Sequence, residues 1–143
     1  MELVGAVASI LSIVKATKTV CSWIAHLIHI SEHIRQLHSE LFSFEILVQG
    51  LQKAMTDETL TTAILHEHVE AVLTEAKCTL NSLKATLMRA KKDGAWNHTK
   101  LRLALNESSC KELSQKIHRH AAALTWIMIV VINSQGLVSP SPF

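Results

Sequence analysis

The stretch Ile34–Met55, IRQLHSELFSFEILVQGLQKAM, carries the periodicity that decides the fold of this 143-residue chain. Its large apolar residues follow one another at alternating steps of three and four positions: Ile34, Leu37, Leu41, Phe44, Val48, Leu51 and Met55. This spacing places one apolar stripe along one face of an α-helix, which is the pattern of a helix-bundle seam. We therefore expect a helix over about residues 31–55, with Ser31 before Glu32 marking its start.

Two more stripes of the same kind follow along the chain. The first predicts a helix that is capped by Thr56, Asp57 and Glu58 and stopped by Gly94, and its stripe consists of Val69, Val72, Ala76, Leu80, Leu83 and Leu87. The second follows a capping-box pattern of Ser109 with Glu112, and its stripe consists of Leu113, Ile117, Ala121, Leu124, Met128 and Val131. Between these two helices, residues 99–105 predict a brief helical turn.

Turn-forming residues are scarce, which excludes a β-rich fold. The chain has four Gly and two Pro, and both Pro lie in the last four residues. A β-rich protein would need many such residues at its turns. We expect an all-α, four-helix-bundle-like domain over residues 1–135 with an apolar N-terminal helix, and a flexible tail over 136–143.

The opening segment, MELVGAVASILSIV (residues 1–14), has twelve uncharged residues, Leu3–Val14, before Lys15. It predicts a helix that continues to about Ile30 and is apolar nearly all round at its start. A signal peptide is disfavoured, because Glu2 replaces the usual basic start and lysines follow in place of a cleavage site. The run is also shorter than the roughly 20 residues of a transmembrane helix. Two interpretations remain: a helix buried at the centre of the bundle, or one that enters a membrane.

Cysteines and histidines give little sign of catalysis. Cys21, Cys78 and Cys110 are widely spaced, which predicts buried thiols in a reducing compartment. His29 and His33 share a helical face, but a metal site needs three or four ligands and no HExxH motif is present. A nucleophile elbow and a glycine-rich phosphate loop are also missing from the sequence. We expect no enzyme activity, no metal and no cofactor.

Charge argues against a nucleic-acid partner. The net charge is +2, and only Trp96 lies among the basic residues as a stacking aromatic. Six of the fourteen basic residues gather in one region, which contains the single acid Asp93: Lys84, Arg89, Lys91, Lys92, Lys100 and Arg102. One interpretation is binding to anionic lipid, at about 1 kcal/mol per basic residue. The other is a solvated loop whose cations complement the C-terminal end of a helix.

Three segments together resemble a known family. They are the opening MELVGAVASILSIV, the segment IRQLHSELFSFEILVQGLQ (34–52) and the segment KLRLALNESSCKELSQKIHRHAAALTWIM (100–128). Over roughly residues 1–130 the chain is similar to the fungal HeLo-like N-terminal domain of NLR-type (STAND) proteins. The resemblance implies a helical bundle, related in design to that of the necroptotic mixed-lineage-kinase-like pseudokinase. The usual Pro-containing break between the first two helices is missing here.

The resemblance also implies a function, that of an executioner of programmed cell death in fungal innate immunity and heterokaryon incompatibility. Such a domain rests in the cytoplasm; on activation its first helix is released, and a homo-oligomer forms pores that permeabilise the plasma membrane. The residues expected to insert are Leu3, Val4, Gly5, Val7, Ile10, Leu11, Ile13 and Val14. Glu2 would lie at the interface or line the pore, or would simply favour the helix N-terminus.

A second hypothesis remains beside the first. A non-lytic helical adaptor would oligomerise through its bundle seams and regulate an NLR-type partner without entering lipid. The exposed seam residues of the later helices would then carry the function.

Overall fold

The computed structural model describes residues 2–56, 63–92 and 94–138, with side chains over 8–53, 68–91 and 94–130. Its helices and strands are α1 (Glu2–Ala25), α2 (Glu32–Thr56), α3 (Ala63–Ala90), β1 (Lys91–Lys92), β2 (Ala95–Trp96), α4 (His98–Ala104) and α5 (Glu107–Val138). The predicted all-α fold is confirmed, and α4 matches the brief helical turn that was expected over 99–105.

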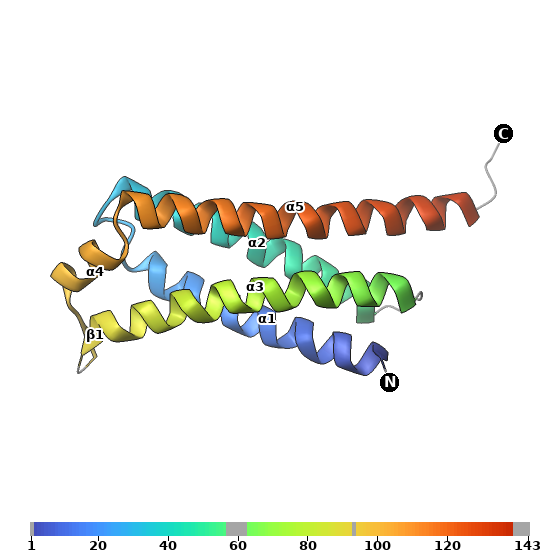
Figure 1. The fold of residues 1–143 in the computed structure, drawn as a ribbon, viewed down its shortest axis with the longest axis horizontal. Coiled ribbons are helices and arrows are strands. Elements are labelled where there is room, and N and C mark those ends of the chain that lie inside the picture. Colours follow the sequence, from blue (N-terminus) through green and yellow to red (C-terminus); the bar gives the residue numbers. More distant parts are fainter. Residues whose placement is uncertain (1, 57–62, 93, 139–143) are drawn as a thin grey trace.

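Four long helices form the bundle in the described part of the chain (Figure 1). Both α1 and α5 pack against α2 and α3, so α1 and α5 lie at opposite corners. In Figure 1, α1 and α3 run toward the end that carries α4 and β1, and α2 and α5 run away from it. The N-terminus of α1 therefore lies at the opposite end of the bundle from α4.

The stripe of α2 is buried as the sequence predicts. Its six described members are each no more than 1% exposed: Ile34, Leu37, Leu41, Phe44, Val48 and Leu51. The side chain of Met55 lies outside the described residues. Ser31 caps the helix, because its Oγ accepts a hydrogen bond of 3.2 Å from the backbone N–H of Ile34.

The stripes of α3 and α5 are broader than predicted. On α3 five of the six predicted residues are buried: Val69, Ala76, Leu80, Leu83 and Leu87. Leu73 is buried in addition, whereas the predicted Val72 is only partly buried. A helix that packs against two neighbours buries a wider face than a single seam, and α3 contacts both α1 and α5. On α5 the buried residues are Cys110, Ile117, Leu124 and Ile127, while Leu113, Ala121 and Met128 are partly buried against them.

Helix α1 ends at Ala25, five residues before the predicted end at Ile30. Tight turns follow, with backbone hydrogen bonds from the N–H of Leu27 to the carbonyl of Ile24 (2.8 Å) and from the N–H of Ile30 to the carbonyl of Leu27 (3.0 Å). Leu27 is 1% exposed. The chain therefore reverses where this side chain is buried in the core, without a Gly or Pro residue to mark the turn in the sequence.

The boundaries of α3 also differ from those predicted. Thr56 is the last residue of α2 and not a cap, and Asp57 and Glu58 lie outside the described residues. At the other end, α3 stops at Ala90 and the chain forms a hairpin of β1 and β2. Gly94 has a φ of 79°. This left-handed conformation, which favours glycine, turns the hairpin rather than ending the helix.

Helix α5 starts earlier and ends later than predicted. Asn106 caps it, accepting a 2.9 Å hydrogen bond at Oδ1 from the N–H of Ser109, so the capping box of Ser109 with Glu112 is wrong. The helix continues to Val138, three residues into the stretch predicted as a tail. Glycine within a helix costs only about 1 kcal/mol relative to alanine, and Gly136 does not stop this one; residues 139–143 lie outside the described part.

Candidate functional site

The described side chains of residues 8–14, in the N-terminal half of α1, form a buried apolar face and leave one large side chain exposed. Ile10 and Ile13 are fully buried and Val14 is 8% exposed, whereas Leu11 is 47% exposed. The structure therefore places three of the four described residues of the predicted inserting segment, all but Leu11, in the core against α2 and α3. Five predicted residues have side chains outside the described part: Glu2, Leu3, Val4, Gly5 and Val7.

The buried face of α1 carries no charge over its described side chains. Lys15 and Lys18 are exposed, and Thr17 is a buried polar residue on this face. The hydroxyl of Thr17 donates a 2.7 Å hydrogen bond to the carbonyl of Ile13, so the helix itself satisfies this group. Helix α1 is therefore held against its neighbours by apolar packing rather than by buried ion pairs.

An aromatic cluster ties the C-terminal end of α1 to the hairpin. The rings of Trp23 and Trp96 meet edge to face, with centroids 6.3 Å apart and planes at 72°. The ammonium of Lys91 lies 5.5 Å from the ring of Trp23 and 5.2 Å from that of Trp96. Both contacts are within cation–π range. We call these three residues the Trp–Lys clamp.

The predicted basic cluster lies at the end of the bundle that carries α4 (Figure 1). Arg89, Lys91, Lys100 and Arg102 are exposed and Lys84 is partly buried, while the side chain of Lys92 lies outside the described residues. A helix of 24 residues such as α1 is about 36 Å long. The basic cluster and the predicted inserting segment therefore lie at opposite ends of the folded molecule.

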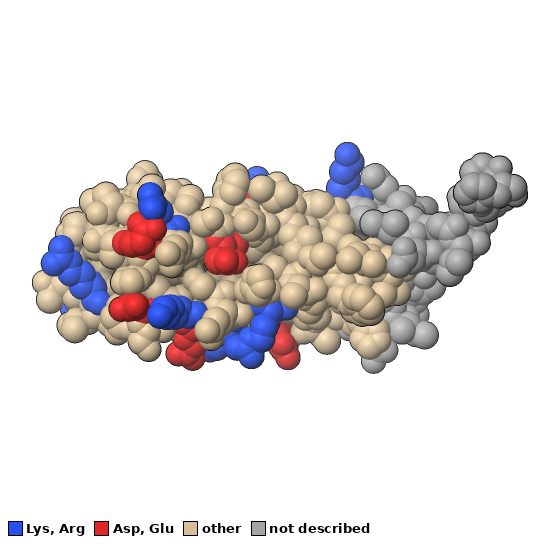
Figure 2. All heavy atoms as spheres, turned by 90° about the horizontal axis from the view of Figure 1, so that it is seen from above, with Lys and Arg blue, Asp and Glu red and all other residues tan. Residues whose placement is uncertain are grey.

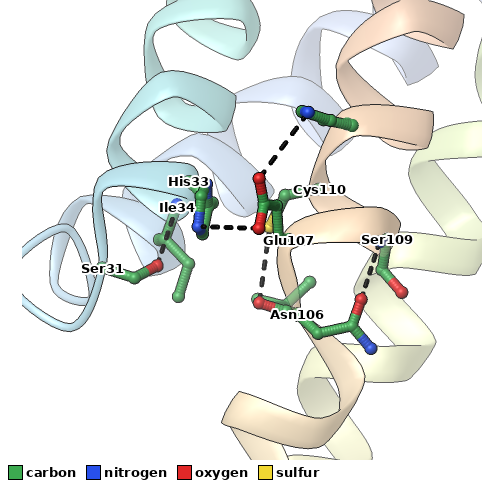
Figure 3. Close-up of polar contacts among 9 residues, drawn as sticks. Ser31, His33, Ile34, Asn106, Glu107, Ser109 and Cys110 are labelled. Atoms are coloured by element: carbon green, nitrogen blue, oxygen red, sulfur yellow. Dashed lines mark hydrogen bonds and ion pairs between the residues drawn. The ribbon is translucent and has the colours of Figure 1, made fainter.

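Two histidines pair with carboxylates across the α2–α5 contact, which the sequence did not indicate. The Nε2 of His33 lies 3.8 Å from the Oε2 of Glu107, and the Nδ1 of His118 lies 3.9 Å from the Oε2 of Glu40. Figure 3 shows Glu107, the first residue of α5, beside His33 of α2. The partners are far apart in the sequence, so only the packing of α2 on α5 brings them together.

A third histidine joins α5 to α3. The Nε2 of His120 lies 3.0 Å from the hydroxyl oxygen of Thr79. Burial lowers the pKa of His120 below its ordinary value of 6.5 and is the largest influence; Glu75 opposes it as the second largest, and Arg119 and Lys116 add smaller effects that lower the pKa. The neutral imidazole is therefore the form that fits this contact.

The three cysteines differ in environment. Cys21 and Cys110 are buried, as predicted, and burial is the main cause that raises the pKa of each thiol to about 11. Glu45 raises the pKa of Cys21 further. Cys78 is exposed, so the prediction of a buried thiol is wrong there. It lies two residues beyond the core residue Ala76, and a step of two turns a helical side chain toward the other face.

Over the described residues, no group of three or more His, Cys, Asp or Glu side chains is placed to hold a metal ion. None of the helices in the described ranges is both long enough and apolar enough to cross a bilayer. Comparison of the chain with protein-family models, with curated proteins and with solved structures finds no significant match in any of the three.

Proposed function

We propose that this protein is a membrane-permeabilising effector of programmed cell death that rests as a helical bundle in the cytoplasm and acts at the plasma membrane as a homo-oligomer. The observation that supports the proposal is the complete burial of Ile10 and Ile13, two residues of the uncharged segment Leu3–Val14, in the core. The resemblance to the HeLo-like domain supplies the biological setting, including an NLR-type partner as activator.

The length of the segment indicates how it would enter lipid. Leu3–Val14 has twelve residues, and as a helix it is about 18 Å long, against a hydrocarbon core of about 30 Å. It would therefore insert into one leaflet, with Lys15 and Lys18 remaining among the headgroups. Each large apolar side chain contributes about 1.5–3 kcal/mol on burial, whether the bundle or the lipid covers it. A trigger of a few kcal/mol is then sufficient to shift the equilibrium.

Release of α1 would also promote self-association. Its departure breaks the Trp–Lys clamp and uncovers the apolar stripes of α2 and α3, which α1 covers in the folded chain. A second copy offers the same stripes and can cover them in turn. Insertion and oligomerisation would thus be coupled through one exposed surface.

The test is dye release from anionic vesicles by the wild-type protein and by Leu11→Asp. Leu11 is 47% exposed, so a charge there leaves the core intact. In the inserted helix, however, Leu11 is the ninth of the twelve uncharged residues, and a charge on a membrane-embedded helix costs up to about 2.5–3.5 kcal/mol, the value at the bilayer centre. We expect Leu11→Asp to retain its circular dichroism spectrum and to lose leakage by more than about tenfold.

Phe42→Asp is the matched control, since Phe42 on α2 is 52% exposed and lies outside α1. It should leak like the wild type. Unchanged leakage by Leu11→Asp would contradict the proposal. Deletion of residues 2–14 is a poorer test, because it also removes Ile10 and Ile13 from the core.

The non-lytic adaptor remains the second candidate, and exposed apolar side chains on α2 and α5 favour it. Phe42 and Ile46 are 52% and 57% exposed, and Trp126 and Ile129 are 66% and 43% exposed. Figure 2 shows few charged side chains on the part of the α5 face that lies away from the α4 end. An adaptor would bind a partner through such surfaces, so Phe42→Asp and Trp126→Asp would impair its self-association, whereas Leu11→Asp would not.

A further inference from the structure

The Trp–Lys clamp is assembled from three elements. Lys91 and Trp96 are directly opposed across the β1–β2 hairpin, so their side chains project from the same face. A 2.7 Å hydrogen bond from the N–H of Asn97 to the carbonyl of Ala90 closes this hairpin, which follows the end of α3 (Figure 1). Trp23 comes from α1, which packs against α3. The two indole rings form the walls of a corner, which we call the indole corner.

The indole corner has the form of an ammonium site. Its rings meet at 72° with their centroids 6.3 Å apart. The Nζ of Lys91 lies at nearly equal distances from both, 5.5 Å from the ring of Trp23 and 5.2 Å from that of Trp96. Tryptophan attracts a cation over its ring face more strongly than other aromatic residues, and aromatic walls of this kind recognise quaternary ammonium groups. We propose that the indole corner binds a trimethylated lysine of a partner protein, and that Lys91 occupies it in the unbound chain.

The distances in the indole corner fit a methylated ammonium. A C–N bond of about 1.5 Å and a carbon contact distance of about 3.5–4.0 Å together place a methylated nitrogen about 5.0–5.5 Å from a ring. The Nζ of Lys91 lies in this range for both rings. Its own hydrogens extend less far than methyl groups, so they leave contact surface on both rings for a larger cation.

A ligand can displace Lys91 without disturbing the walls. Lys91 is exposed, and its ammonium is carried on a flexible four-carbon chain. Among the side chains that the structure describes, no carboxylate lies within ion-pair distance of this ammonium. Trp23 and Trp96, in contrast, are partly buried and pack against the apolar core. The indole corner therefore keeps its shape when its occupant is exchanged.

The charge around the indole corner indicates which kind of peptide would carry the methylated lysine. Arg89, Lys100 and Arg102 are exposed at this end of the bundle, and a displaced Lys91 would add another cation. These charges repel a free quaternary ammonium ion, whereas they attract acidic residues beside a methylated lysine. We therefore expect the partner to carry its trimethyllysine within an acidic sequence.

NMR spectroscopy of the indole N–H groups tests the proposal. The chain has three tryptophans, and Trp126 on α5 lies outside the indole corner, so its signal is an internal control. The probe is a short peptide with one trimethyllysine between glutamates, and we expect it to shift the signals of Trp23 and Trp96 alone. The same peptide with unmodified lysine should bind at least about tenfold more weakly. A trimethyllysine peptide with lysines in place of the glutamates should bind at least about threefold more weakly.

Variants of Lys91 separate an occupied corner from an open one. Lys91→Ala vacates the indole corner and should strengthen peptide binding by about threefold or more. Lys91→Arg keeps a cation against the rings and should bind no more tightly than the wild type. Arg102→Ala removes an equal charge from the same end of the bundle without changing the clamp, so it should not reproduce this gain. All three positions tested are exposed side chains, so each variant should keep the wild-type circular dichroism spectrum.

Three results would overturn the indole corner as a binding site. They are unshifted signals of Trp23 and Trp96 in Lys91→Ala at about 1 mM peptide, an equal shift of Trp126, and equal affinity for the methylated and unmodified peptides. Phosphatidylcholine vesicles present a quaternary ammonium group on a membrane, and larger shifts with these vesicles than with the peptide would overturn the assignment to a protein partner. No variant here changes Leu11, so the outcome is independent of the dye-release result.

Discussion

At the scale of single residues, His120 gives the structure a pH dependence of known sign. Its ring joins α5 to α3 through Thr79, and burial lowers its pKa below 6.5. The unfolded chain therefore takes up this proton first as the pH falls. The contribution of His120 to stability is present above about pH 6.5 and is lost as the pH falls toward the lowered pKa of the folded state.

We predict that His120→Gln loses less stability than the wild type between pH 7.5 and pH 5.5, because glutamine has no ring to protonate. Urea unfolding at the two pH values measures the difference. His29→Gln, an exposed change in the turn after α1, should follow the wild type. If the unfolding free energies of His120→Gln and the wild type change equally with pH, the assignment of this pH dependence to His120 is wrong.

At the scale of the elements, Asn106 determines where α5 begins. Its Oδ1 accepts from Ser109, and its Nδ2 donates a 3.0 Å hydrogen bond to the carbonyl of Leu103 at the end of α4. One side chain therefore caps the start of α5 and satisfies a carbonyl group in the last turn of α4. The capping-box pattern of Ser109 with Glu112 placed the cap of this helix three residues after its actual cap, Asn106.

We predict that Asn106→Ala destabilises the protein by about 1 kcal/mol, which lowers the melting temperature by about 2–4 °C in a chain of this size. Ser109→Ala should change stability by less than about 0.5 kcal/mol, because its hydroxyl is not the cap. Thermal unfolding followed by circular dichroism compares the two. A larger loss of stability in Ser109→Ala than in Asn106→Ala would contradict this assignment and support the capping box of Ser109 with Glu112.

At the scale of the whole molecule, α1 and α5 are linked through shared neighbours. Each packs against α2 and α3, and one apolar core joins all four helices. Removal of either α1 or α5 would uncover the apolar stripes of α2 and α3. We therefore expect the resting bundle to unfold as one cooperative unit.

We predict that Ile13→Ala, which opens a cavity at a fully buried position, costs about 2–5 kcal/mol of unfolding free energy. Circular dichroism and tryptophan fluorescence should report the same, lowered urea midpoint. Leu11→Ala should stay within about 0.5 kcal/mol of the wild type, since Leu11 is largely exposed. A separate early transition in tryptophan fluorescence would show that α1 detaches by itself.

The candidate site was predictable only in part. The apolar opening and the basic region are visible in the sequence, because hydropathy and charge are properties of single residues. The Trp–Lys clamp is not, because it requires the hairpin of β1 and β2 to return Trp96 to Lys91 at the end of α3. The contacts His33–Glu107 and Thr79–His120 likewise join residues that are distant along the chain.

The sequence by itself determined the helices and their buried faces. Apolar residues at steps of three and four form a stripe along one face of a helix, whether or not a neighbouring helix is present. The six described members of the α2 stripe are all buried for this reason. The tertiary structure decided where helices end, as at Ala25, where burial of Leu27 turns the chain. It also decided how wide a face of α3 is buried, so that Leu73 is buried while Val72 is only partly buried, and Cys78 is exposed. A stripe defines a direction within one helix, whereas burial depends on where neighbouring helices lie.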